Sequence, residues 1–226
     1  IASFMDEELY ATVDSLFRNA KSPKNIYVSI YSQDVDHPDL QPIFDEFGIT
    51  RFTYDKINYL LSRGVGFARV HTQKDLSLKY KYYLQIDSHT RFEKNWDSKI
   101  VSDYERLQSV WGTFIFSSYP PGYEYVNDEV VLIENGRIPP VVNIKRNSEF
   151  NKFEAKYTDY FGGIKGQRTG YFCAGLAFGY TKYFLQVPYD PNIYFQGEEQ
   201  TMSVRFYENN IAIVCPPDLY LYHDYV

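Results

Sequence analysis

Cysteine is scarce in this sequence: only Cys173 and Cys215 occur among its 226 residues. Two cysteines make no disulfide framework, so we expect free thiols and a reducing, cytoplasmic setting, although one bond between them stays open. The sequence also lacks a signal peptide and an N-x-S/T glycosylation site. No apolar run approaches the roughly 18 residues of a membrane span, so we expect no membrane-spanning segment.

Positive charge is also in short supply. Lys and Arg number 23 against 29 Asp and Glu, which gives a formal net charge of −6 and an isoelectric point near 5.3. A chain with this balance does not present the broad basic surface that nucleic acids and anionic membranes require. We therefore expect no nucleic-acid partner, while a local basic pocket for a phosphate stays compatible with these numbers.

Aromatic residues, by contrast, are abundant at 19%, with 23 Tyr and 17 Phe but only 2 Trp. Two explanations are open. An AT-rich genome favours Tyr and Phe, and half-buried strand positions accept them. Alternatively, rings line a groove, because the stiff amphipathic face of tyrosine suits the C–H faces of sugars.

Hydrophobic periodicity divides the chain into helices and strands. Residues 6–20 place Leu9, Val13, Leu16 and Phe17 at helical spacing, and acidic residues open this segment, as the dipole of a helix prefers. Further helices are expected at 65–79, 95–110 and 198–209, and strands at 25–32, 80–86, 112–120, 211–217 and 219–226.

The order of these elements predicts the fold class. Helices and strands alternate in the first half, which favours an α/β fold with a mostly parallel sheet. Residues 122–170 mix Gly, Pro and charges of both signs, so we expect them to be irregular. The length fits a single domain. Because both ends of the chain, "IASF" and "YHDYV", are strand-like, we expect a domain that is trimmed at both ends.

The stretch "YYLQIDSHTRF" ends an apolar, strand-like run in Asp87, Ser88 and His89. Residues i and i+2 of an extended segment point the same way, so Asp87 and His89 can converge on one ion while Ser88 faces elsewhere. A carboxylate with an imidazole suits Mn²⁺ better than Ca²⁺ or Mg²⁺. Asp and His after a strand are also ordinary turn residues, and both interpretations stay open here.

Histidine is rare, which limits the choice of a further metal ligand. The four histidines are His37, His71, His89 and His223. His223 ends another strand-like run, "YLYHDY", and ligands of an open α/β sheet bind beyond the carboxyl ends of its strands. His223 is therefore the candidate that completes the site, the alternative being an exposed histidine near a chain end.

Several motifs, in chain order, resemble one family. They are "IASFMDEEL", "GFARVHTQ", "YYLQIDSHTRFEKNWD", "SSYPPGYE", "CAGLAFG", "VPYDPNIYFQGEEQTMSVRFYENN" and "YLYHDY". Together they span nearly the whole chain and resemble the GlcNAc-transferases of glycosyltransferase family 60, typified by a cytoplasmic enzyme that modifies hydroxyproline on a ubiquitin-ligase adaptor. More distantly, they are similar to the polypeptide GalNAc-transferases, which also use D-x-H, a distant His and a G-G-E-N block.

The resemblance implies a GT-A fold, a Rossmann-like α/β sandwich, and the lack of a G-x-G-x-x-G dinucleotide motif agrees with it. Within the single domain, residues of about 1–119 would bind the nucleotide and residues of about 120–226 would face the sugar and the acceptor. The implied reaction is a retaining transfer of GlcNAc, or a close hexose, from a UDP-sugar to a hydroxyl group of a protein or glycan.

The same resemblance implies a donor site. Asp87, His89 and His223 would hold Mn²⁺, with Mg²⁺ as second choice, between the two phosphates of UDP-GlcNAc. Arg69 would brace the diphosphate with a forked pair of bonds, unless it only forms an ion pair on a helix. The remaining donor-binding candidates are Ala2, Ser3 and Phe4 for the uracil, Ser88 for the ribose or sugar, and Ala174 and Gly175, small residues in an aromatic strand, for the sugar.

Two adjacent carboxylates follow Gly197 at an expected helix start, where they also complement the helix dipole. The resemblance implies that Glu198 contacts hexose hydroxyls. It also implies that Glu199 positions the acceptor hydroxyl or stabilises charge on the reacting sugar, and that Arg205 braces the pair. Weaker candidates, whose patterns ordinary turns also explain, are Asp190 near the sugar and Tyr119, Pro120, Pro121 and Tyr123 near the acceptor.

Three alternatives stay open. The donor can be UDP-Gal, UDP-Glc or UDP-GalNAc, since one hydroxyl orientation or one substituent separates these sugars. The domain can also bind carbohydrate without turnover, although the intact Asp87, His89 and His223 speak against this. A metal-dependent phosphohydrolase would need more clustered carboxylates for a two-metal site.

Overall fold

A computed structural model describes residues 1–127, 129–133, 141–147, 152–158 and 166–225. The helices are α1 (Leu9–Asn19), α2 (Gln41–Phe47), α3 (Val65–Thr72), α4 (Trp96–Trp111), α5 (Thr181–Gln186), α6 (Glu198–Glu208) and the short 3₁₀ helices η1 (Pro23–Asn25) and η2 (Tyr59–Leu61). The strands are β1 (Ala2–Phe4), β2 (Val28–Gln33), β3 (Phe52–Ile57), β4 (Tyr82–Ile86), β5 (Thr90–Phe92), β6 (Phe114–Ser117), β7 (Tyr123–Val126), β8 (Glu129–Leu132), β9 (Val141–Asn147), β10 (Lys152–Thr158), β11 (Arg168–Thr169), β12 (Leu176–Tyr180), β13 (Ala212–Val214) and β14 (Leu221–His223).

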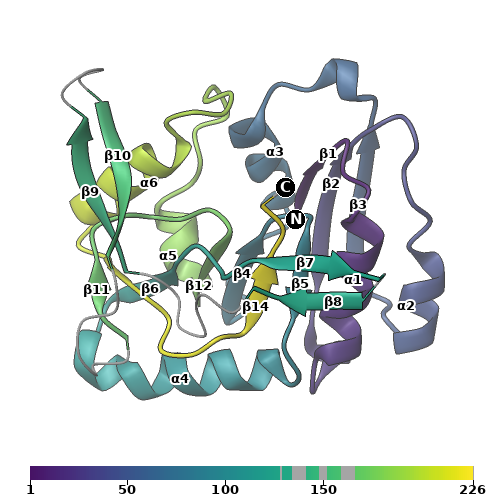
Figure 1. The fold of residues 1–226 in the computed structure, drawn as a ribbon, viewed down its shortest axis with the longest axis horizontal. Helices are drawn as coiled ribbons and strands as arrows, with labels where there is room; N and C mark the ends of the chain where they lie inside the picture. The colour runs from purple at the N-terminus through teal and green to yellow at the C-terminus, as the bar shows by residue number, and fades with distance from the viewer. Residues whose placement is uncertain (128, 134–140, 148–151, 159–165, 226) are drawn as a thin grey trace.

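Two sheets meet near the middle of the molecule (Figure 1). The first has the order β1-β2-β3 and is parallel, and the second has the order β11-β13-β6-β12-β4. A single parallel bridge between Ala2 and Asp87 connects β1 with the end of β4.

Strand direction differs between the two sheets. In the second sheet only β13 and β6 run parallel, whereas β4 with β12, β12 with β6, and β11 with β13 are antiparallel. The expectation of a mostly parallel sheet therefore holds for the N-terminal half alone, and the sheet system as a whole is mixed. The reason is that β12 returns from the second half of the chain and inserts between β4 and β6 in the opposite direction.

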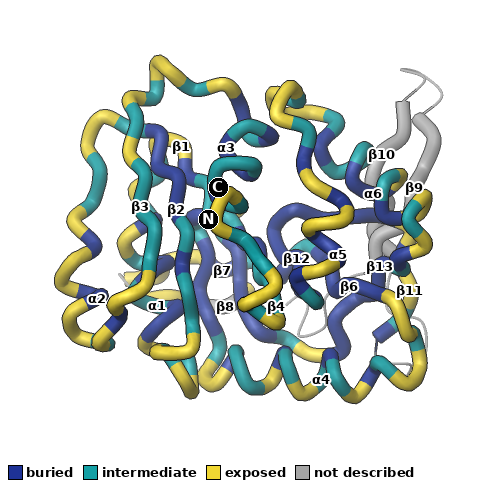
Figure 2. The backbone as a smooth tube through the Cα atoms, turned by 180° about the vertical axis from the view of Figure 1, so that it is seen from behind, coloured by how far each residue is buried: buried dark blue, intermediate teal, exposed yellow. Residues whose placement is uncertain are grey.

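Two amphipathic helices close the core, in line with their sequence periodicity. Their apolar stripes are buried, while the opposite face of α4 is exposed or half-buried (Figure 2). A stripe at helical spacing packs onto the sheet because it lies on one side of the helix. The buried apolar residues of these helices are Leu9, Val13, Leu16 and Phe17 in α1 and Trp96, Ile100, Tyr104 and Leu107 in α4.

Several boundaries differ from the sequence expectation. The first helix begins at Leu9, so the acidic residues precede it instead of forming its first turn. The helix expected at 65–79 ends at Thr72. The prediction of an irregular segment at 122–170 is wrong for the described residues, because β7–β8 and β9–β10 form antiparallel hairpins there. Strands such as "NIKRN" and "KFEAK" pair locally and carry no long apolar run that would reveal them.

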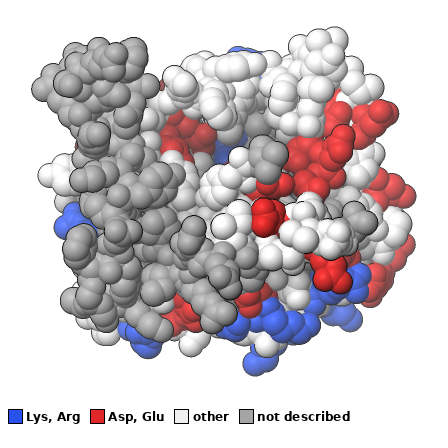
Figure 3. Space-filling model, viewed as in Figure 1, with Lys and Arg blue, Asp and Glu red and all other residues white. Residues whose placement is uncertain are grey.

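Charged side chains of both signs lie on the surface, in line with the sequence composition. Acidic side chains gather over the right side of one face, toward β1–β3, while Lys and Arg lie along its lower edge (Figure 3). Cys173 and Cys215 are both buried, and no disulfide bond joins them in the described part of the chain. Within the described ranges, no helix has the length and apolar character needed to traverse a bilayer.

The turn after β4 is brought together with the last strand. The chain leaves β4 at Ile86, passes through Asp87 to His89 and enters β5 directly. Strand β5 pairs antiparallel with β14, and His223 stands opposite Thr90 in this register. A further bridge joins His223 to Gly122, ahead of β7. The distant histidine is thus delivered to the edge of the sheet where β4 ends.

Candidate functional site

The three predicted metal ligands lie together. One ligand atom each from Asp87, His89 and His223 fall within 4.8 Å of one another. The Nε2 atoms of His89 and His223 are 3.0 Å apart, and His223 Nε2 is 3.1 Å from Asp87 Oδ2. Two imidazole lone pairs that face each other repel unless a proton or a cation lies between them. The set of two imidazoles and one carboxylate therefore fits a divalent cation such as Mn²⁺.

Asp6, in the turn between β1 and α1, contacts this cluster and was not predicted from the sequence. Its Oδ2 accepts hydrogen bonds from His89 Nδ1, at 2.7 Å, and from Ser88 Oγ. Burial raises the pKa of Asp6, but the hydrogen bonds from His89 and Ser88 outweigh it, so the pKa lies below its usual value. Ser88 is 3% exposed and its hydroxyl donates to Asp6, while its contact with the ribose or sugar stays a prediction.

The electrostatic environment of the cluster favours positive charge. Burial by itself lowers the pKa of His89, yet the bond to Asp6 and the charge of Asp87 raise it above its usual value. Burial likewise raises the pKa of Asp87, but the Arg69 guanidinium and the two histidines hold it well below its usual range. Asp87 is thus ionised at neutral pH and available to a cation.

Arg69, on α3, lies against protein atoms. It is 2% exposed, its Nη1 donates to the Ile86 carbonyl at 3.1 Å, and its Nη2 pairs with Asp87 Oδ1 at 2.6 Å. Burial lowers the pKa of Arg69, whereas Asp87 and Glu198 raise it above its usual value. The two terminal nitrogens of Arg69 thus bond to Ile86 and Asp87, and its bond to the diphosphate stays a prediction.

Glu198 begins α6 and faces Arg69. The Gly197 that precedes it has φ +96°, a left-handed conformation that favours glycine. Glu198 is 6% exposed, and its Oε1 lies 3.5 Å from Arg69 Nε. Neither atom makes a hydrogen bond with any described residue. Burial raises the pKa of Glu198 although Arg69 opposes the shift. The ion pair with Arg69 therefore fixes Glu198 close to the Asp87 side of the site.

Glu199 is held by hydrogen bonds from the protein. Its Oε1 accepts the Ala174 backbone N–H at 2.8 Å, and its Oε2 accepts the Tyr119 hydroxyl. Burial raises the pKa of Glu199 above its usual range, against the bonds from Tyr119 and Ala174. The carboxylate therefore holds the segment around Ala174 in place beside the cluster.

Ala174 and Gly175 lie just before β12, which begins at Leu176, and not within a strand as expected. In the segment just before Ala174, serine hydroxyls accept the backbone N–H groups in place of a neighbouring strand. Ser203 Oγ accepts the Phe172 N–H at 2.8 Å, and Ser117 Oγ accepts the Cys173 N–H at 2.7 Å.

Gly175 packs against the metal cluster. A Cβ at this position would lie 3.2 Å from Pro120 Cδ and 3.5 Å from both Asp87 Oδ2 and His223 Cδ2. Glycine thus lets the backbone approach the ligands closely.

Strand β1 reaches the same edge. Ser3 is buried, and its carbonyl accepts a hydrogen bond from Gln33 Nε2 at 3.3 Å. Phe4 is 50% exposed, and its ring meets Tyr59 edge-on with centroids 6.5 Å apart. Since the neighbouring Ala2 forms the bridge to Asp87, the strand lies next to the cluster and presents one open aromatic face.

Other candidates serve the fold. Arg205 donates to the Pro188 carbonyl and does not brace the glutamates, because seven residues along a helix separate the two ends by about 10 Å. Asp190 Oδ1 accepts the Asn192 N–H at 2.8 Å, which is the turn interpretation. Pro121 and Pro120 accept bonds from the last strand segment, at 3.0 Å from His223 N and 2.6 Å from Tyr225 Oη. Tyr123 is buried at the start of β7.

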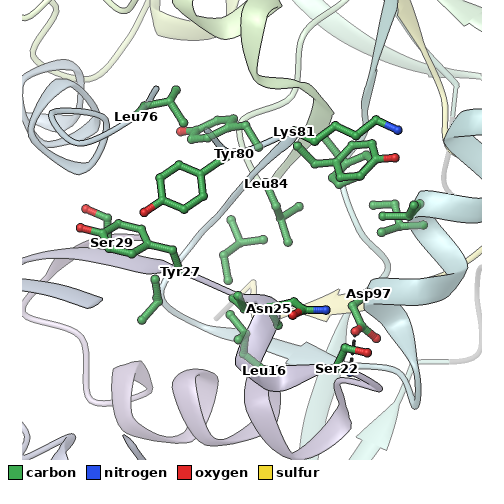
Figure 4. A pocket seen from close by; sticks show the side chains of 18 of the residues that line it. Leu16, Ser22, Asn25, Tyr27, Ser29, Leu76, Tyr80, Lys81, Leu84 and Asp97 are labelled. Carbon is green, nitrogen blue, oxygen red and sulfur yellow. Dashed lines mark hydrogen bonds between the residues drawn. The ribbon is translucent and has the colours of Figure 1, made fainter. Parts of the chain in front are cut away.

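A cavity of about 660 Å³ lies elsewhere, in the space between β2 and β4. Tyr27, Ser29, Tyr80 and Leu84 surround it (Figure 4). None of the candidate site residues lines this cavity. The candidate site is therefore the cluster at the carboxyl end of β4, which carries the metal-ligating side chains, and not this cavity.

Comparisons with known proteins show the family and the fold. A family model described as "Glycosyltransferase (GlcNAc)" matches residues 46–226. The crystal structure of GalNAc-T7 with UDP, GalNAc and Mn²⁺ is similar, with a TM-score of 0.71 and 15% identity over 99% of this chain and 43% of that chain.

Two structures of TarS from S. aureus are also similar. For residues 1–349 the TM-score is 0.61, with 13% identity over 99% of this chain and 59% of that one. For the second TarS structure the TM-score is 0.58, with 15% identity over 98% of this chain and 35% of that chain. The chain thus spans less than two thirds of each. Comparison with curated protein sequences gives no match. The likenesses confirm the predicted GT-A-type α/β fold.

Proposed function

Because this chain belongs to the GlcNAc glycosyltransferase family, we propose that it is a metal-dependent, retaining glycosyltransferase. It moves GlcNAc, or a close hexose, from a UDP-sugar to a hydroxyl group of a protein or glycan. The observation that carries the proposal is the convergence of Asp87, His89 and His223 at the carboxyl end of β4. The presence of UDP, GalNAc and Mn²⁺ in the similar GalNAc-T7 structure supports it.

The chain's residues hold the cation and shape its surroundings. Asp87, His89 and His223 are the proposed ligands of Mn²⁺, and Mg²⁺ is the second choice because it prefers oxygen ligands. When bound, such a cation supplies positive charge to the diphosphate of the donor as the leaving group departs. Arg69 acts from below by fixing the Asp87 carboxylate through a 2.6 Å ion pair.

The donor is proposed to lie between β1 and the Ala174–Gly175 segment. Backbone groups of Ala2 and Ser3 and the exposed ring of Phe4 are the proposed partners of the uracil. Ser88 is the proposed neighbour of the ribose, although its hydroxyl bonds to Asp6. On the sugar side, the backbone at Ala174 and Gly175 allows close approach. Glu198, which Arg69 holds beside the cluster through an ion pair, is the proposed acceptor of hydrogen bonds from the hexose hydroxyls.

The proposed transfer uses no enzyme nucleophile. Glu199 is committed to Ala174 and Tyr119, and Glu198 faces Arg69, so neither carboxylate is offered for double displacement. The acceptor oxygen bonds to the anomeric carbon on the face that the phosphate leaves. The bond between that carbon and the phosphate oxygen breaks, and the acceptor proton passes to the departing phosphate, giving the glycoside and UDP.

Hydrolysis of UDP-sugars with Mn²⁺ present tests the proposal. We expect turnover by the natural protein and its loss in Asp87→Ala and His89→Ala, because each removes one ligand. His37→Ala is the matched control, since His37 bonds to Ser32 Oγ at 2.9 Å, outside the cluster. Undiminished turnover in both ligand variants would contradict the metal site.

A donor panel tests the finer claim. Faster turnover of UDP-GlcNAc than of UDP-Gal, UDP-Glc or UDP-GalNAc is expected. If another sugar is preferred, the donor assignment changes while the reaction class stands. Binding of free glycans that needs neither UDP nor Mn²⁺, with no turnover, would instead identify a carbohydrate-binding domain.

A further inference from the structure

We propose that Asp6 is a positioning residue of the metal site: its carboxylate fixes the tautomer of His89 so that the imidazole presents a free Nε2 lone pair to the cation. The inference rests on the proposed metal-dependent function and adds to it a residue outside the D-x-H motif. Asp6 lies 83 residues before His89 in the sequence, and its side chain is 13% exposed.

The backbone conformation at Met5 places Asp6 beside the turn that follows β4. Met5 has φ +46°, in the left-handed region, and its N–H donates to the Gln33 carbonyl at 3.0 Å. A non-glycine residue in this conformation is uncommon and marks a sharp change of chain direction. The change turns the chain out of β1 and directs the Asp6 side chain toward Ser88 and His89.

The two oxygens of Asp6 have separate tasks. Oδ1 accepts the Glu8 N–H at 3.0 Å and so organises the turn before α1. Oδ2 accepts from His89 Nδ1 at 2.7 Å and from Ser88 Oγ. A residue that served only the turn would need the first bond alone. The second oxygen, Oδ2, instead accepts hydrogen bonds from His89 and Ser88 in the turn after β4.

The bond to Nδ1 decides which ring nitrogen faces the ion. An ionised carboxylate only accepts hydrogen bonds, so Nδ1 carries the proton, and in the neutral imidazole Nε2 then keeps its lone pair. That Nε2 points at His223 Nε2, 3.0 Å away. Carboxylates that orient metal-binding histidines in this way typically change metal affinity by about 10- to 100-fold when they are removed.

Asp6→Asn is the sharpest variant. Both carboxylate oxygens of Asp6 accept hydrogen bonds, whereas the amide of Asn has one accepting oxygen and one donating nitrogen. The amide must therefore turn a donor toward either the Glu8 N–H or His89. We expect Mn²⁺ affinity to fall by about ten-fold or more, measured with Mn²⁺ alone by the electron paramagnetic resonance signal of the free ion. Asp6→Ala, which removes both bonds, should fall at least as far.

Nitrogen-15 spectra of the metal-free protein give a readout that a purely structural role would not move. With four histidines in the chain, His89 is identified by comparison with His89→Gln. The natural protein should show a protonated Nδ1 on His89, and the Asp6 variants should shift it toward the Nε2-protonated form. Asp14→Asn is the matched control, since Asp14 pairs with Arg18 on α1 at 2.7 Å, and its affinity should stay within about two-fold because exposed charges are screened.

The outcomes separate the two claims. If the natural protein binds no Mn²⁺, the proposed metal-dependent function fails and this inference fails with it. If it binds Mn²⁺ and Asp6→Asn matches it in affinity and in His89 tautomer, only the role of Asp6 is refuted. If either Asp6 variant does not fold, the other carries both measurements.

Discussion

The Nε2 atoms of His89 and His223 lie 3.0 Å apart, although 134 residues separate the two histidines in the sequence. Their rings meet edge-on, at 89° and with centroids 4.4 Å apart. This arrangement depends on the pairing of β14 with β5, in which His223 stands opposite Thr90. Two nitrogens held this close by separate segments form a preorganised site, since little rearrangement is needed to bind one ion between them.

Removal of the distant ligand should abolish metal binding. In His223→Ala, Asp87 and His89 remain, but the facing nitrogen is lost. We expect Mn²⁺ affinity to fall by more than the roughly 10- to 100-fold that changes behind the ligands produce. Titration of Mn²⁺ by electron paramagnetic resonance measures this, with His37→Ala as control. An affinity within the error of the natural protein's would remove His223 from the site.

A methyl group at Gly175 should impair the site with little effect on the fold. The added Cβ meets Pro120 Cδ at 3.2 Å and Asp87 Oδ2 at 3.5 Å. Since a displacement of about 1 Å can cost 100-fold in rate, we expect UDP-sugar hydrolysis to fall by at least about ten-fold. Gly170→Ala is the matched control, because a Cβ there has no atom within 4 Å among the described residues. Equal rates in both variants would show that the backbone at Gly175 does not border the reaction.

Arg69 should be essential for stability. It lies between two carboxylates, 2.6 Å from Asp87 Oδ1 and 3.5 Å from Glu198 Oε1. Breaking a buried pair by removing one partner typically costs about 3–5 kcal/mol, because the remaining charge is left without compensation. We expect Arg69→Met to lower the free energy of unfolding by this amount in urea titrations.

The control for this variant is Arg18→Met, which removes an exposed arginine that is paired with Asp14 and Glu46. It should change the free energy of unfolding little, since exposed ion pairs contribute little. A loss of the same size in both variants would mean that burial between the carboxylates is not the cause.

Glu199 should make stability depend on pH. Its pKa is raised, so the folded protein binds the proton more tightly than the unfolded chain, and the contribution to stability falls as pH rises through the raised pKa. Glu199→Gln removes this dependence. Relative to the natural protein, the variant should therefore gain stability between about pH 5 and about pH 8, measured by urea unfolding at both values.

Glu208→Gln is the control for that comparison, because it removes an exposed carboxylate from the same helix, α6. Its stability relative to the natural protein should change little over this range. If Glu199→Gln instead loses relative stability as pH rises, the sign of the pKa shift at Glu199 is wrong.

The two thiols should be unreactive in the folded protein. Burial raises the pKa of Cys215 to about 12 and that of Cys173 well above its usual value. Since the thiolate is the reactive form, an aromatic disulfide reagent at about pH 8 should modify neither thiol until a denaturant is added, and then both. Rapid modification of one equivalent without denaturant would show that one of these side chains is accessible.

Local patterns were enough to predict much of the architecture. Helices α1 and α4 carry clear apolar stripes, and β4 and β6 consist mostly of aromatic and aliphatic residues, so each was found within a few residues of its bounds. The prediction missed β3 because most of its residues are only half buried and show no alternation.

The site was predictable to the extent that its signals are local. Asp87 and His89 are two residues apart on one strand end, which a sequence shows directly. The partnership of Asp6 with His89 joins residues 83 apart, and an acidic residue before a helix has an ordinary explanation in the helix dipole. Likewise, Arg69 and not Arg205 reaches Glu198, which depends on the packing of α3 against the end of β4.

The junction between the two sheets has a consequence for how ligands affect the molecule. In the described part of the chain, the ladder that joins β1 to β4 is the single pair Ala2 and Asp87. A donor that contacted β1 at one end and the Gly175 backbone at the other would span this junction and contact both sheets. Ligand at about 100 times its dissociation constant adds about 2.7 kcal/mol to the folded state. The substrate would thus stabilise the domain at the junction of its two sheets, where β1 and β4 are joined by one backbone bridge.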